Sequence, residues 1–308
     1  MLPTASDLPP AALTNALDEA LELLREYDRD DTSAEPLPSL LAQCESIVAG
    51  IGGPQPLRSI HHFACTGGTL ISRALFALPN TVVLSEIDPL GPLPRSRPGR
   101  VPFAPTDLIR ALRHSIREVG DETIIATFLD GLAAARAGLE RGGRHLILRD
   151  HAHSQFCQGA VDFTARPTLH EMLAGRFDLR SVLTVRHPLD SFLALASHGW
   201  VHFTPSTLED YARRYLAFLD RHAGITVFSY EEFTTDPETV LQQMCAALDL
   251  TYSPLATALI GAIRLSGDSG RSGERIAPRP RRPVPPGIEA QREGRSYQAL
   301  CARLGYAP

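Results

Sequence analysis

Short apolar runs rich in β-branched residues alternate with longer amphipathic segments along most of the chain. Five such runs predict β-strands, at residues 59–64, 82–84, 145–148, 181–185 and 225–228. Apolar residues spaced three and four apart predict helices between them, at residues 106–116, 122–139, 189–197, 208–222 and 237–248. No hairpin signal joins two of the strands. The pattern therefore predicts an α/β fold, in which a parallel sheet carries helices on both faces.

The two ends of the chain and one internal segment depart from this alternation. Residues 1–56 predict an N-terminal helical extension, which precedes an α/β domain at residues 57–308. The prolines that follow Asp88 exclude regular structure, and two helices come after them. We expect this helical insert, residues 88–143, to shape the acceptor side of a site. An arginine-rich loop at 264–282 and a last helix at 288–304 close the chain.

The composition limits the classes of function. Of 308 residues, 44% are hydrophobic and 21% are charged, which is ordinary for a soluble globular protein. The net charge of -5 argues against nucleic-acid partners and polybasic membrane binding. We expect no membrane span and no secretory signal, because no apolar run is long enough and the N-terminus lacks a basic segment. Five scattered cysteines without a CxxC pair predict a reduced, cytoplasmic protein without a disulfide framework.

The first predicted strand runs directly into a loop of small residues, Cys65-Thr66-Gly67-Gly68-Thr69, and helical spacing starts at Leu70. Glycines allow the backbone to turn tightly, and the N-terminus of a helix attracts anions. This strand–loop–helix unit therefore predicts a cradle for a nucleotide phosphate. The 30 basic residues are all arginine, so a lysine-dependent phosphate loop is excluded. Any cation that contacts the phosphate must be arginine, histidine or a metal.

Polar residues also follow the other predicted strands. Glu86 follows the second strand, Arg149 the third, Arg186 the fourth and Tyr230 the fifth. In a parallel sheet, ligands bind beyond the carboxyl ends of the strands. We therefore expect these side chains and the glycine loop to form one active site.

This ordered set of motifs resembles the sulfotransferases that use 3'-phosphoadenosine 5'-phosphosulfate (PAPS). The resemblance covers residues 58–282 and lies in the order of motifs more than in residue identity. It implies the P-loop NTPase-like sulfotransferase fold, and adenosine 3',5'-bisphosphate (PAP) as the product of the donor. It implies the following cofactor-binding residues: Cys65, Thr66, Gly67, Gly68, Thr69, Leu70, Arg186, Ser191, Tyr230, Arg271 and Ser272.

Within this family, the spacing is most similar to that of the tyrosylprotein sulfotransferases. That resemblance implies that Glu86 is the general base and that Arg149 steadies the transferring group. His151 or His153 is expected as an acceptor contact or auxiliary base. Ser272, after Arg271, is expected to close over the cofactor.

Two positions differ from the family's pattern. Cys65 stands where the loop normally carries a basic residue, and Ala194 stands where a serine eight positions after the motif's arginine is expected. Ser191 or Ser197 would then have to reach the 3'-phosphate. The missing charge would come from Arg73, Arg149 and the arginines of the tail. A donor other than PAPS remains an alternative.

Paired histidines raise the question of a metal. His61-His62 and His151-x-His153 could each offer ligands, but no third ligand follows at a recognisable spacing. We therefore predict no metal. His61 and His62 alternate across a strand, so at most one of them faces the site, and packing is the simpler interpretation of both.

The sequence favours an enzyme that moves the sulfuryl group of PAPS to a hydroxyl or amine of a small-molecule or biosynthetic acceptor. Two alternatives remain. One is an ATP-using P-loop phosphotransferase, which would lack the loop lysine and a clear pair of Mg²⁺ ligands. The other is a degenerate nucleotide-binding protein, which is motivated by Cys65 and Ala194. The acceptor's identity and the oligomeric state cannot be derived from these patterns.

Overall fold

A computed structural model describes residues 55–91, 106–159, 162–263 and 276–308, together with Asp18, Glu22 and Ser39. The chain divides into two compact units, Met1–Gly53 and Pro54–Pro308. Almost all of the predicted helical extension, residues 1–56, lies outside the described residues, although Asp18 and Glu22 are helical. The second unit contains every feature discussed below.

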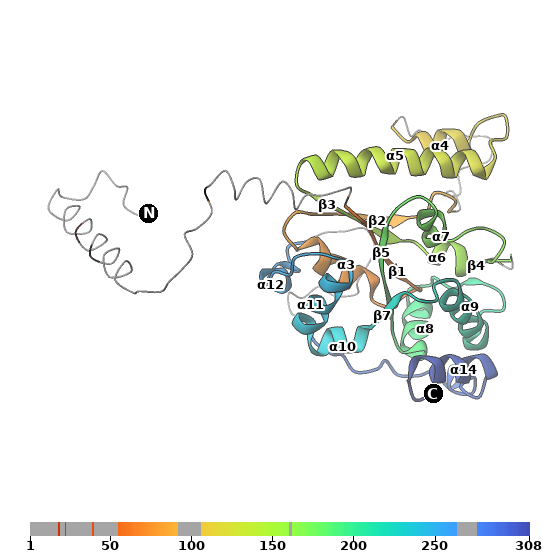
Figure 1. Cartoon of the computed structure of the whole chain (residues 1–308). Helices are drawn as coiled ribbons and strands as arrows, with labels where there is room; N and C mark the ends of the chain where they lie inside the picture. Colours follow the sequence, from red (N-terminus) through yellow and green to blue (C-terminus); the bar gives the residue numbers. More distant parts are fainter. Residues whose placement is uncertain are drawn as a thin grey trace. The chain divides into compact units, whose positions relative to one another are not determined.

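A five-stranded, fully parallel sheet lies at the centre of the second unit, in the order β2-β3-β1-β5-β7 (Figure 1). All five predicted strands are present, and the predicted α/β class is confirmed. Their bounds are β1 Leu57–His62, β2 Thr81–Ile87, β3 His145–Asp150, β5 Leu179–Val185 and β7 Thr226–Ser229. β1 is the middle strand and is buried along its whole length, as expected for a strand covered on both faces.

Helices cover both faces of the sheet (Figure 1). One face packs against α3 Gly68–Phe76, α10 Tyr230–Thr235, α11 Pro237–Ala247 and α12 Leu255–Leu259. The other face packs against α5 Asp121–Arg141, α6 His153–Phe156, α7 Leu169–Ala174, α8 Pro188–Ser197, α9 Leu208–Arg221 and α14 Arg295–Leu304. Three smaller elements are α4 Leu108–Arg113 and the paired strands β4 Gln158–Gly159 and β6 His202–Phe203.

The alternation of side chains along β1 assigns each residue to one of these layers. Ile60 lies in the core with α3 and α11, whereas Leu57 and Phe63 lie in the cores with α5 and α9. His61 and His62 therefore point to opposite faces, as predicted.

The predicted last helix, residues 288–304, is wrong in one respect, because it is broken into α13 Pro286–Glu289 and α14. Gly294 has extended backbone before α14, and Glu209 supplies a cap from α9. Its carboxylate accepts hydrogen bonds from Ser296 N at 2.9 Å and from Tyr297 N at 3.3 Å. A tertiary contact thus restarts the helix where its local periodicity is continuous.

None of the helices in the described part of the chain combines the length and the apolar character needed to cross a bilayer.

Candidate active site

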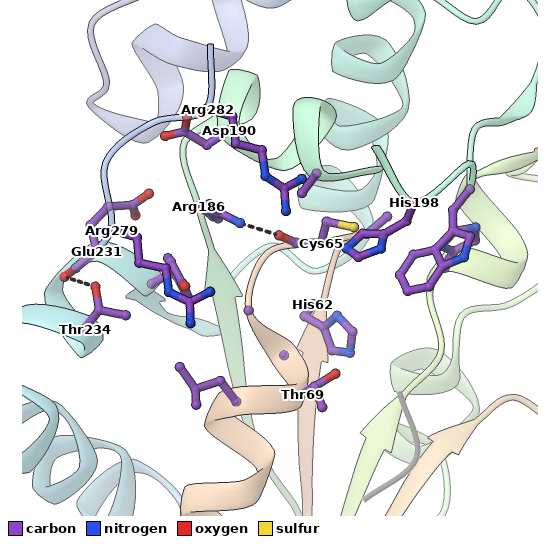
Figure 2. A pocket seen from close by; sticks show the side chains of 18 of the residues that line it. His62, Cys65, Thr69, Arg186, Asp190, His198, Glu231, Thr234, Arg279 and Arg282 are labelled. Atoms are coloured by element: carbon purple, nitrogen blue, oxygen red, sulfur yellow. Dashed lines mark hydrogen bonds between the residues drawn. The ribbon is translucent and has the colours of Figure 1, made fainter. Parts of the chain in front are cut away.

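A cavity of about 600 Å³ opens at the carboxyl ends of the parallel strands (Figure 2). Most of the residues that the sequence predicted for the active site line this cavity. They are Cys65, Gly67, Gly68, Thr69, Glu86, Arg149, His151, Arg186 and Tyr230, and Leu70 lines it as well. Five strand ends therefore contribute to one concave site, which is where ligands bind in open parallel sheets.

The glycine loop is shaped by two close approaches. Gly67 has a φ of 89°, and a Cβ there would lie 2.2 Å from the ring of Tyr230. A Cβ on Gly68 would lie 2.3 Å from the ring of His62. Glycine is required at both positions, because any side chain would displace an aromatic ring. Gly67 is also the N-cap of α3, whose first turn contains no acidic residue, so the helix end can accept an anion.

Arg149 joins the glycine loop to the next strand. Its side chain is almost fully buried, and it donates from Nε to His62 Nε2 at 3.0 Å and from Nη2 to Thr69 Oγ1 at 2.8 Å. His62 Nδ1 donates to the Phe63 carbonyl at 3.1 Å, which leaves Nε2 free of a proton and able to accept. Burial and the neighbouring Arg149 charge hold the pKa of His62 well below its ordinary value, so this imidazole is neutral.

Glu86 lies between this arginine and a histidine. Its Oε1 forms an ion pair with Arg149 Nη1, and its Oε2 lies 3.2 Å from His151 Nε2. Its backbone is left-handed, with a φ of 62°, and the register of β2 against β3 shifts between Leu84 and Ile87. This bulge turns the carboxylate toward the cavity, since such irregularities redirect side chains at strand ends.

Arg186 and Tyr230 also line the cavity, and Figure 2 shows Arg186. The Arg186 guanidinium carbon lies 4.6 Å from the centre of the Tyr230 ring, and Nη1 donates to the Cys65 carbonyl at 3.3 Å. Among the described residues, Arg186 Nε is buried and has no hydrogen-bond partner. An orphaned donor on a cationic group at a cavity wall points to an anionic ligand.

Two arginines of the C-terminal segment complete this wall, and sequence reasoning identified them only as part of a basic tail. Arg279 and Arg282 line the cavity near Arg186 and Asp190 (Figure 2). Arg281 forms an ion pair with Asp190 at 2.8 Å, which holds the segment against α8. The site therefore gains positive charge from a region far away in the sequence.

Two residues that were predicted to contact the nucleotide, Thr66 and Ser191, do not line the cavity. Thr66 is fully buried and donates from Oγ1 to the Phe63 carbonyl at 2.8 Å. Ser191 is fully buried and donates to the His187 carbonyl at 2.8 Å within its own helix. Both hydroxyls donate hydrogen bonds to nearby backbone carbonyls, which is common for threonine and serine near helix ends.

Two further predictions concern Arg73 and the pair Arg271 and Ser272. Arg73 donates to the Ile260 carbonyl at 2.5 Å and does not line the cavity, so it does not supply the missing loop charge. Arg271 and Ser272 lie outside the described residues.

The remaining wall of the cavity is rich in imidazole. His153 and His202 line it, with ring centres 6.1 Å apart, and His198 stacks on Trp200 at 4.5 Å. Burial lowers the pKa of His153 to about 4, so this ring is neutral near pH 7. Sequence reasoning missed His198, Trp200 and His202, because they follow α8 in a segment without a recognisable motif.

Comparison with solved structures identifies the fold. The sulfotransferase domain from the curacin biosynthetic pathway matches with a TM-score of 0.50 at 15% identity, over 82% of this chain and 98% of that domain. The sulfotransferase domain of the Synechococcus PCC 7002 olefin synthase matches with a TM-score of 0.47 at 17% identity, over 83% of this chain and 96% of that domain. No protein-family model and no curated protein matches the sequence. The likeness to the curacin domain confirms the predicted sulfotransferase fold.

Proposed function

We propose that this protein transfers the sulfuryl group of PAPS to a hydroxyl or amine of an acceptor molecule. One observation carries the proposal: a carboxylate, Glu86, is ion-paired with Arg149, which is itself bonded to Thr69 of the glycine loop. A proton acceptor, a buried cation and an anion cradle thus meet in one cavity of about 600 Å³. The sulfotransferase fold supports the same conclusion.

The residues of the cavity fit a nucleotide with anionic groups at both its 5' and its 3' positions. The backbone N–H groups of Gly67 to Thr69 would hold the 5'-phosphate at the start of α3. Arg186, with its orphaned Nε, would bind the 3'-phosphate together with Arg279 and Arg282. These arginines would replace the serine absent at Ala194. Tyr230, packed on Gly67, would contact the adenine.

When bound, PAPS would supply the sulfuryl group, and PAP would depart. Glu86 would accept the proton that the acceptor's hydroxyl or amine releases. His151, 3.2 Å from Glu86 Oε2, would orient this carboxylate toward the acceptor. The Arg149 guanidinium would stabilise the negative charge that develops near the loop, because it is held rigidly by His62 and Thr69 in a site of low dielectric.

Thermal unfolding with added nucleotide tests the proposal. PAP at a hundredfold excess over its Kd should stabilise the folded protein by about 2.7 kcal/mol. ATP at the same concentration should raise the Tm much less, because it lacks a 3'-phosphate for Arg186. Arg186→Gln should remove most of the PAP shift, whereas Arg180→Gln, a matched change at an exposed ion pair, should keep it. Equal shifts with ATP and PAP, or no shift at millimolar PAP, would contradict the proposal.

Turnover of labelled PAPS with a panel of hydroxyl and amine acceptors tests the base. Glu86→Gln should keep the thermal shift with PAP and lower kcat by about 10²–10⁴-fold. Glu238→Gln, an exposed position on α11, serves as the matched control and should change neither quantity. Unchanged kcat in Glu86→Gln would remove this carboxylate from the mechanism.

A further inference from the structure

A second polar cluster lies on the face of the sheet opposite the side chains of His62 and Arg149. His61, Asp150 and His222 each offer one ligand atom, and these atoms lie within 4.8 Å of one another. The three side chains are almost completely buried, at 0%, 4% and 2% exposure. None of them lines the cavity of the candidate active site. Three elements far apart in the sequence, β1, β3 and the end of α9, thus bring two imidazoles and a carboxylate together.

His222 has a lone pair directed into this cluster. Its Nδ1 donates to the Phe218 carbonyl at 2.8 Å, which fixes the tautomer and leaves Nε2 without a proton. Nε2 is buried and has no hydrogen-bond partner in the described part of the chain. The nearest oxygen of Asp150 lies 3.9 Å away, beyond hydrogen-bonding distance. Protein interiors seldom leave such an acceptor unsatisfied, so a missing partner is indicated.

His61 is oriented in a similar way. Its Nδ1 lies 2.8 Å from Asp150 Oδ2, and its Nε2 lies 2.9 Å from Ser59 Oγ. Ser59 Oγ in turn lies 2.8 Å from Ser181 Oγ. Histidines that bind metals usually donate their second ring N–H to an oxygen, which fixes the ring. Ser59 for His61 and the Phe218 carbonyl for His222 are positioned for this role.

We propose that His61 Nδ1, Asp150 Oδ2 and His222 Nε2 bind a divalent transition metal, Zn²⁺ in the first instance. Two imidazoles and one carboxylate form a donor set that suits zinc, with bond lengths of about 2.0–2.2 Å. Two ligand atoms of a tetrahedral zinc lie about 3.4 Å apart. The 3.9 Å between His222 Nε2 and Asp150 Oδ2 and the 2.8 Å between His61 Nδ1 and Asp150 Oδ2 lie on either side of that separation. Binding moves the proton of His61 from Nδ1 to Nε2, which then donates to Ser59 Oγ, and the Ser59 hydroxyl donates to Ser181 Oγ instead.

The metal would act as a structural element. It would tie the end of α9 to β1 and β3. In each of these two strands, a residue of the cavity is next to the proposed metal ligand: His62 follows His61, and Arg149 precedes Asp150. The bulk of the core separates it from solvent, so it would have no access to an acceptor. This inference does not depend on the proposed transfer reaction.

Zinc stoichiometry tests the site in the full-length protein. Chelator-treated protein is incubated with one equivalent of ZnCl₂, freed of unbound metal by gel filtration and analysed for zinc by mass spectrometry. The expected ratio is about one zinc per chain, with a rise in Tm. His222→Gln and the isosteric Asp150→Asn should lose both, whereas His114→Gln on α4 should keep both. The double variant His151→Gln/His153→Gln, which removes two of the cavity's histidines, should also keep both.

Cobalt provides a readout that does not require a variant of the buried cluster. The Co²⁺-loaded wild type should show two paramagnetically shifted, slowly exchanging imidazole N–H signals, from His61 Nε2 and His222 Nδ1. A zinc-free wild type would overturn the proposal. So would zinc retention in both His222→Gln and Asp150→Asn, or its loss from the cavity double variant alone.

Discussion

Individual residues at the site adopt backbone conformations or contacts that their types do not favour. Cys65 and Glu86 both have a φ of 62°, in the left-handed region. At Gly67 and at Gly68, an aromatic ring occupies the space that a Cβ would need. Such features concentrate where a site requires a fixed geometry, because surrounding contacts must maintain them.

Gly68→Ala should destabilise the loop. The new Cβ would lie 2.3 Å from the His62 ring, which is buried and holds Arg149. We expect the free energy of unfolding to fall by about 1–3 kcal/mol, the usual effect of overpacking. PAP binding should weaken as well, because the Arg149–Thr69 contact moves.

Gly131→Ala is the matched control, measured in the same urea titration. Gly131 lies inside α5, and a Cβ there would meet nothing within 4 Å. Alanine should raise the free energy of unfolding by about 0.5–1 kcal/mol. If both variants were stabilised, the close approach of His62 to the loop would be wrong.

At the scale of elements, the C-terminal segment supports the loop that follows β5. Tyr306 Oη donates to Glu231 Oε2 at 2.7 Å, and Glu231 Oε1 accepts from His187 N at 3.1 Å. His187 Nε2 donates to the Ala307 carbonyl at 3.0 Å. The residue before His187 is Arg186, so the end of the chain fixes a residue of the cavity through one carboxylate.

Tyr306→Phe tests this connection. Loss of a hydrogen bond to a carboxylate should cost about 1.5 kcal/mol in the free energy of unfolding. If half of this cost appears in ligand binding, the Kd for PAP should rise roughly threefold, which isothermal calorimetry can measure. Tyr252→Phe removes a hydroxyl elsewhere and should alter neither quantity. A Kd equal to that of wild type would show that the loop does not depend on the C-terminal segment.

At the scale of the whole molecule, the sequence predicted the sheet well and the site partly. Strands and long helices have periodic signals, so β1 and α9 could be located from apolar spacing. The short elements α6, α7, α10 and α12 carry too few residues for a period to emerge. Ser191 does not line the cavity, because its hydroxyl donates to the His187 carbonyl, and a sequence motif does not determine such a side-chain rotamer.

Long-range pairings were beyond the sequence for a different reason. Arg279 and Arg282 reach the cavity only because the C-terminal segment crosses α8. The ligand set of His61, Asp150 and His222 spans three elements, so no local spacing reveals it. Local patterns report the position of a residue on an element, and the tertiary fold decides which elements meet.

The molecule as a whole should lose stability in mild acid. Burial lowers the pKa of His145, His153 and His187, so these rings take up protons less readily in the folded state than in the unfolded chain. The unfolded chain protonates them near pH 6.5 and therefore binds more protons as the pH falls. The contribution of these neutral rings to the free energy of unfolding is fully present above pH 6.5. For His153, this contribution is lost progressively as the pH falls to its folded pKa of about 4.

Urea unfolding at pH 7 and pH 5 measures this effect. His153→Gln should reduce the difference in unfolding free energy between the two pH values by about 1 kcal/mol, because its ring no longer titrates. His114→Gln, on α4, is the control for loss of a histidine elsewhere. A pH dependence identical to that of wild type would show that folding does not shift the pKa of His153.

The alternation of side chains on β1 and β3 has an evolutionary consequence. His61-His62 and Arg149-Asp150 divide between the two faces of adjacent strands, so the same four positions serve the cavity and the buried cluster. Insertion or deletion of one residue within either strand would exchange the members of its pair and damage both at once. Descendants of this chain can therefore vary in length at their loops, while the middle of the sheet can change only by substitution.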